Sequence, residues 1–133
     1  MNQNYEFRKD QIASHLEYLG YDVENKEDHI FAKHAKYLNI LVKFLDDGTS
    51  IYGLYSMSES AKNDRAGVLE AINKFNLESY CTKFFMFEDA STLCISAWIP
   101  GEYEKLSFGK IMSRFNDDLI KVRINSGLEQ YIR

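Results

Sequence analysis

The stretch that decides the fold runs from Thr82 to Ile99 and reads TKFFMFEDASTLCISAWI. Its alternation predicts a β-hairpin closed by the loop Glu88 to Ser91, because loop length fixes the register and side chains alternate between faces. Phe87 then pairs with Thr92. One face of this hairpin carries only apolar side chains, which are Phe84, Met86, Leu93, Ile95, Ala97 and Ile99.

The opposite face of the hairpin is also apolar. It carries Phe85, Phe87 and Trp98 among Lys83, Ser96 and two cysteines. An antiparallel sheet normally leaves less aromatic surface to water, so we expect something to cover this face. The cover is either one of the chain's own helices or another molecule.

A second hairpin is predicted from Leu38 to Leu45 and from Ser50 to Ser56, around the segment Asp46 to Thr49. Its Asp-Gly pair favours a two-residue primed turn. The pairs predicted on one face are Phe44 with Ile51, Val42 with Gly53 and Ile40 with Tyr55, and those on the other are Lys43 with Tyr52 and Leu41 with Leu54. Both faces again hold apolar residues.

Helical spacing of apolar residues predicts three helices. The first runs from about residue 7 to 19 and ends at Gly20, and the second runs from about 64 to 75 with the stripe Val68, Leu69, Ile72 and Phe75. The last begins near Glu102 or Ser107, ends at residues 125–127, and is followed by a loose tail over 128–133.

These elements predict an α+β fold in one domain over residues 1–133. Two further short strands are expected at residues 21–24 and 29–34. The architecture is an antiparallel sheet of five or six strands with three helices, in the order α-β-β-β-β-α-β-β-α.

Two local motifs carry a family resemblance. Ile72, Asn73 and Asn76 give the pattern I-N-x-x-N, and a strand ending in Trp98, Ile99 and Pro100 precedes a long helix. With the element order, these features resemble the YbjN-type domain and the wider type III secretion chaperone-like fold, over about residues 7 to 122. The resemblance implies a small acidic domain, often a homodimer, that binds another polypeptide or acts in regulation. It supplies no catalytic residues.

Composition argues against several classes of function. The net charge is −4, and the basic residues of the last helix are interspersed with Asp117 and Asp118, so a nucleic-acid partner is not expected. The N-terminal segment has no apolar run, and no stretch is long enough to span a bilayer. We expect no membrane association and a cytoplasmic location.

The residues that could carry chemistry do not form a recognisable motif. His15, His29 and His34 lack metal-ligand spacing, and neither Cys81 nor Cys94 has a histidine in its hairpin. In the predicted register the two cysteines are too far apart for a disulfide. We therefore expect structural histidines, free thiols, and no catalytic residue, metal or cofactor.

The functional hypothesis is a non-enzymatic, partner-binding or regulatory protein that dimerises and holds an extended segment of another chain. The candidate partner-binding residues are Leu41, Tyr52, Leu54, Phe85, Phe87 and Trp98. A second hypothesis is a ligand-sensing domain with a pocket between the sheet and the last helix, lined by Tyr55, Phe115 and Asn73. An enzyme is the third, because a fold alone does not exclude a grafted site.

Overall fold

A computed structural model describes residues 5–79, 81–124 and 127–133. It contains one sheet of six strands in the order β1-β2-β3-β4-β6-β5, with all neighbouring strands antiparallel. The strands are β1 (Asp22–Asn25), β2 (His29–Lys33), β3 (Ile40–Leu45), β4 (Gly48–Ser56), β5 (Thr82–Met86) and β6 (Thr92–Pro100). The predicted fold class is confirmed.

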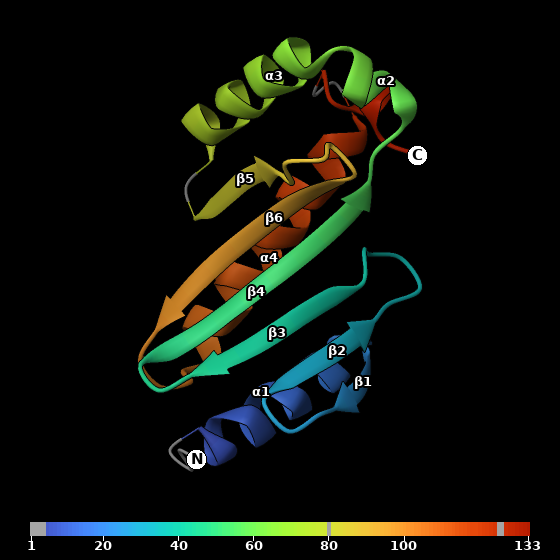
Figure 1. Ribbon diagram of the computed structural model, residues 1–133. Coiled ribbons are helices and arrows are strands. Elements are labelled where there is room, and N and C mark those ends of the chain that lie inside the picture. The colour runs from blue at the N-terminus through green and yellow to red at the C-terminus, as the bar shows by residue number, and fades with distance from the viewer. Residues whose placement is uncertain (1–4, 80, 125–126) are drawn as a thin grey trace.

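Two helices that contribute to the core lie behind the sheet in Figure 1. These are α1 (Glu6–Tyr18), behind β1 and β2, and α4 (Lys105–Arg123), behind β4 and β6. The buried stripe of α4 is Phe108, Met112, Phe115, Leu119 and Val122. Its spacing of three and four residues places all five on one side of the helix. The helix therefore packs along its length against the face of the sheet that carries Phe84, Leu93 and Ile95.

The described residues form four α-helices where the sequence predicts three. The additional helix is the short α2 (Glu59–Asn63), and α3 (Arg65–Glu78) follows it after Asp64. The Asp64 carboxylate accepts a hydrogen bond from Gly67 N at 3.1 Å and is the N-cap of α3. Leu69, predicted in the apolar stripe of this helix, is exposed.

The register of the aromatic hairpin is confirmed. Thr82 pairs with Ala97 and Phe85 with Cys94, and Phe87 N donates to Thr92 O at 2.9 Å. The face that carries Phe84, Leu93 and Ile95 is turned to the core, with Leu93 and Ile95 fully inaccessible and Phe84 at 2% exposure. The loop length was sufficient to fix this register because β5 and β6 pair without interruption on either side of the loop.

The predicted register of the β3–β4 hairpin is wrong by two residues. Phe44 pairs with Thr49 and Val42 with Ile51, so the loop consists of Asp46 and Asp47 alone. Neither aspartate has a positive φ, and the predicted primed turn does not form. A shift of two leaves every side chain on its predicted face, since side chains alternate with period two.

The β3–β4 turn is held by a side chain from α1. The Arg8 guanidinium donates to Gly48 O at 2.5 Å, Leu45 O at 2.9 Å and Asp46 O at 3.3 Å. Lys9 does the same for the β1–β2 turn, donating to Lys26 O at 2.5 Å. These two cations connect α1 to both turns, a role the sequence analysis did not identify.

The C-terminal segment is packed, and the predicted loose tail is wrong. Leu128 is fully buried, Tyr131 is 6% exposed, and Ile132 forms a β-bridge with Met57. The Tyr131 hydroxyl donates to Asp64 Oδ2 at 2.6 Å. The tail therefore contacts the beginning of α3. Of the residues predicted to end the last helix, Asn125 and Ser126 lie outside the described residues.

Candidate protein-binding surface

All six predicted partner-binding residues lie on the face of the sheet opposite α1 and α4. We call this set the aromatic face, and it consists of Leu41, Tyr52, Leu54, Phe85, Phe87 and Trp98. The strand pairing places these residues on one face, because residues paired directly across neighbouring strands point to the same side of the sheet. One row of paired residues crosses the sheet from β5 to β2, through Lys83, Ser96, Tyr52, Leu41 and Phe31.

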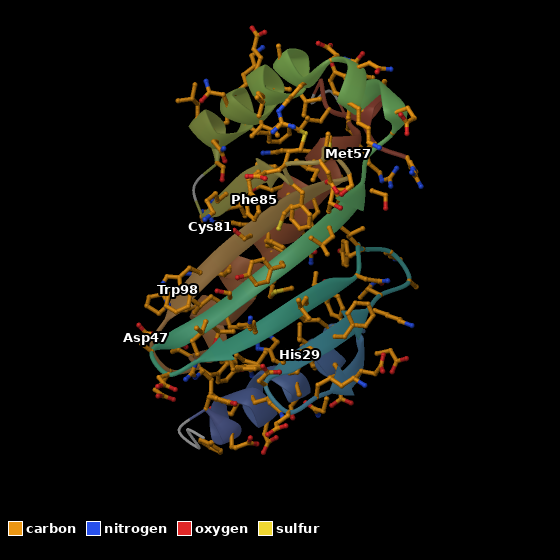
Figure 2. The ribbon with its side chains drawn as sticks, viewed as in Figure 1. His29, Asp47, Met57, Cys81, Phe85 and Trp98 are labelled. Carbon is orange, nitrogen blue, oxygen red and sulfur yellow. The ribbon has the colours of Figure 1, made fainter. Side chains whose placement is uncertain are left out.

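The aromatic face is open in the described part of the chain. Figure 2 shows Phe85 and Trp98 on the side of the sheet turned toward the viewer, away from α4. Trp98 is 46% exposed, Leu54 45% and Phe87 43%. Leu41, Tyr52 and Phe85 are half-buried by their neighbours. The chain's own helices therefore do not provide the cover that this apolar surface requires.

Trp98 is positioned by a glycine on the neighbouring strand. A Cβ added at Gly48 would lie 2.5 Å from two atoms of the Trp98 ring and 2.6 Å from Ile99 O. Only a glycine lets the ring lie flat against β4 at this point. Gly48 is thus required by packing rather than by the turn, which explains why the Asp-Gly signal predicted the wrong register.

Lysines surround the aromatic face. Lys33, Lys43 and Lys83 are exposed and point to this side, with Lys83 Nζ 5.5 Å from the centre of the Phe85 ring. Asp22 and Glu24 share the face but lie on β1, at the far edge. Lys33 pairs directly with Asp22, whereas the residues paired with Lys43 and Lys83 are not acidic. The positive charge of this face therefore lies on β3 and β5, although the chain as a whole carries −4.

Phe31 is a functional candidate that the sequence analysis missed. It pairs with Leu41, so it extends the apolar surface onto β2. Lys33 Nζ lies 5.8 Å from the centre of its ring. The alternation of HIFAK in residues 29–33 was a usable signal, because Phe31 must face opposite to Ile30 and Ala32.

The outer edge of β5 is closed by the side chains of Asn76, on α3, and of Ser79, the residue that follows α3. Asn76 Nδ2 donates to Phe84 O at 3.0 Å, and Phe84 N donates to Asn76 Oδ1 at 2.8 Å. Ser79 Oγ donates to Thr82 O at 2.6 Å and accepts from Thr82 N at 3.1 Å. Since these backbone groups point away from β6, they are the groups that an added strand would use.

The two cysteines are free thiols, as predicted. Burial raises the pKa of Cys94 to about 11. Burial and the nearby Asp118 also raise the pKa of Cys81. A thiol with a raised pKa is a poor nucleophile at neutral pH, so neither residue is activated for catalysis.

The histidines are dispersed. His15 Nδ1 and the Tyr103 hydroxyl share a hydrogen bond of 2.8 Å, His29 contacts Asp28, and His34 contacts Leu19 O. Burial, and then the charge of Lys105, lower the pKa of His15. Within residues 5–79, 81–124 and 127–133, no three His, Cys, Asp or Glu side chains are grouped to hold a metal.

The residues of the alternative ligand pocket do not come together. Tyr55 and Phe115 are packed in the core, with the Tyr55 hydroxyl donating to Leu119 O at 2.7 Å. Asn73 lies on α3, in the wall of a separate open cavity beside Gly67 and Tyr131. Around Tyr55 and Phe115 the space between the sheet and the last helix is therefore filled by core side chains, and no ligand pocket forms from these three residues.

No helix in the described residues is both long and apolar enough to cross a membrane.

No protein-family model matches the chain, and no curated protein matches it in sequence. Solved structures do match. YbjN from E. coli, a candidate transcription regulator, is similar with a TM-score of 0.71 and 14% identity, over 93% of this chain and 94% of that one.

Two other solved structures share the architecture. An uncharacterized protein from Methanothermobacter thermautotrophicus has a TM-score of 0.63 and 16% identity, over 86% of this chain and 93% of its own. A chain of the heterodimeric ExoU–SpcU complex, from the type III secretion system of Pseudomonas aeruginosa, has a TM-score of 0.62 and 14% identity. The match covers 84% of this chain and 93% of that one. The chain has the YbjN-type, secretion chaperone-like fold that its sequence predicts.

Proposed function

We propose that this chain is a non-enzymatic adaptor, chaperone-like or regulatory, which forms one domain over residues 1–133 and binds another polypeptide through the aromatic face. The observation that carries the proposal is the open apolar surface on the side of the sheet that α1 and α4 leave uncovered. One structural neighbour belongs to a heterodimeric complex, and another is a candidate regulator, which supports a partner-binding role.

The aromatic residues supply enough apolar area for binding. Trp98 and Phe87 still expose nearly half of their surface. Covering each removes about 100 Å2 from water and contributes about 2 to 3 kcal/mol before association costs. Together with Leu54 and the half-buried side chains, they form the central anchors that protein interfaces depend on.

The partner binds across the face and not as an added strand beside β5. Side-chain hydrogen bonds from Asn76 and Ser79 occupy the outward backbone groups of Phe84 and Thr82. Strand addition would have to break these bonds first. An extended segment laid over β4 and β6 meets the aromatic side chains directly.

The partner segment is acidic as well as apolar. Lys33, Lys43 and Lys83 surround the aromatic face, and complementary charge raises the rate and the specificity of association. A segment that alternates aromatic or aliphatic residues with Asp or Glu would satisfy both features of this surface.

Homodimerisation is the second part of the proposal. When no partner is bound, a second copy covers the aromatic face. The lysines of the two copies then repel one another, so the dimer should strengthen as salt screens them. Light scattering at low and high salt tests this, and a mass that stays monomeric at high protein concentration in both buffers would contradict it.

Selection of peptides from a random library on the immobilised chain tests partner binding. We expect enriched peptides to combine apolar and acidic residues. Trp98→Glu and Phe87→Glu should each weaken their binding at least about tenfold. Ile120→Glu is the matched control, because Ile120 lies on α4 and is 43% exposed. Unchanged binding by both face variants would refute the proposal.

A cytoplasmic location belongs to the same proposal. The free thiols of Cys81 and Cys94 fit a reducing compartment.

A further inference from the structure

A cavity of about 270 Å3 lies on the helix-covered side of the sheet, between α1 and the beginning of α4. Arg8 and Ile12 of α1 line it, together with Thr49 of β4, Ile99 of β6 and Phe108 of α4. Thr49 pairs with Ile99, and both point away from the aromatic face. The cavity is therefore separate from the proposed protein-binding surface.

The inner wall of the cavity is apolar apart from one cation and one hydroxyl. Ile12 and Thr49 are each 1% exposed, Phe108 is 2% exposed, and Arg8 is 1% exposed. The residues at the mouth are exposed and acidic, with Glu102 and Glu104 both lining the cavity. A buried positive charge thus lies beneath a negatively charged rim.

Arg8 lacks the partner that a buried cation normally has. Its two terminal nitrogens donate to neutral oxygens of the β3–β4 turn, including Gly48 O and Thr49 Oγ1. Its Nε is buried and has no hydrogen-bond partner. Within the described part of the chain, no carboxylate forms an ion pair with it. Buried charges are usually paired, so this cation makes the cavity wall a favourable place for an anionic group.

The rim of the cavity, in contrast to its inner wall, favours a cation. The backbone N–H of Leu106 and the hydroxyl of Ser107 donate to Glu104 and hold the pKa of its carboxyl below the ordinary value. Glu104 is therefore ionised at neutral pH, with Glu102 two residues away. A simple anion is repelled at the mouth, whereas an ammonium group is attracted.

We propose that this cavity binds a small zwitterion whose carboxylate and ammonium groups are separated by an apolar body, as in an ω-amino acid or a dipeptide. The carboxylate faces Arg8 and provides a counter-charge. The body lies along Ile12 and Phe108, and the ammonium group lies between Glu102 and Glu104.

Calorimetric titration of the full chain tests the site. The probes are 6-aminohexanoate and the dipeptide Gly-Leu, compared with hexanoate and hexylamine, which each carry one of the two charges. We expect both zwitterions to bind at least about tenfold more tightly than either single-charge analogue. Failure of both zwitterions to bind at millimolar concentration, or equal binding of hexanoate, would overturn the proposal.

Two variants locate the binding. Ile111→Trp places a large side chain in the cavity wall and should abolish binding of 6-aminohexanoate. Glu102→Gln, at an exposed position, should weaken 6-aminohexanoate about fivefold and leave hexanoate unweakened. Glu17→Gln, on an exposed position of α1 outside the cavity, is the charge-matched control and should change nothing. Equal affinity in Glu102→Gln and the unmodified chain would refute the assigned orientation, even if the tryptophan variant failed to fold.

Discussion

Replacing Arg8 with methionine tests whether a side chain of α1 determines the β3–β4 turn. Arg8 donates to four oxygens of this turn, at distances between 2.5 and 3.3 Å. Methionine keeps most of the aliphatic stem and removes the guanidinium. The substitution therefore isolates the hydrogen bonds and the charge from the packing of the stem.

The expected cost follows from which acceptors water can reach. Leu45 and Asp46 are exposed, so water replaces Arg8 at their carbonyls. Gly48 and Thr49 are buried, and their oxygens lose a donor that water cannot easily replace. Each buried acceptor left without a donor costs about 1 to 3 kcal/mol. Removing the guanidinium also removes a buried charge that has no ionic partner, which offsets part of this cost. We expect Arg8→Met to lower the free energy of unfolding by about 2 to 4 kcal/mol.

Urea denaturation followed by tryptophan fluorescence measures this loss, because Trp98 lies directly on Gly48. Arg65→Met is the matched control. Arg65 donates to Glu88 O at 2.8 Å from an exposed position, so its removal should cost less than about 1 kcal/mol. An Arg8→Met variant within about 1 kcal/mol of the unmodified chain would refute the view that Arg8 holds the turn.

Three further predictions concern the sheet edge, the tail and the thiols. Asn76→Ala removes two hydrogen bonds to Phe84, and it should cost about 1 to 2 kcal/mol in urea denaturation and cause concentration-dependent association in light scattering, unlike the control Asn73→Ala. The Tyr131 hydroxyl and then Gly67 N lower the pKa of Asp64 in the folded chain. This stabilisation is fully present above the ordinary value of 3.8 and is lost as the pH falls through the folded pKa, so Tyr131→Phe should lower the melting temperature at pH 7 and have a smaller effect under acid conditions. A thiol reagent at pH 8 should label half-buried Cys81 first and Cys94 only on unfolding, because burial raises the pKa of Cys94 to about 11; fast labelling of Cys81→Ser would contradict this.

Local pattern predicted the strands well, and the errors arose where distant residues intervene. The β3–β4 register was missed because Arg8 and Trp98, remote in sequence, select the two-residue loop and require Gly48. The packed tail was missed because its apolar residues are few and depend on Met57 and Asp64 for their contacts. In both cases the local sequence fits the wrong prediction as well as the observed structure. The Asp-Gly pair fits a primed turn, and the last residues fit a loose end.

The sequence by itself determined which residues share a face of each hairpin. Period-two alternation and loop length are local properties, and they placed all six residues of the aromatic face together. The sequence could not decide which face stays open, because both faces of the two hairpins are apolar. That choice came from tertiary packing, since α1 and α4 both lie on the same side of the sheet and bury their apolar stripes there. The closed edge of β5 was decided in the same way, because α3 brings Asn76 beside a strand whose own residues give no sign of it.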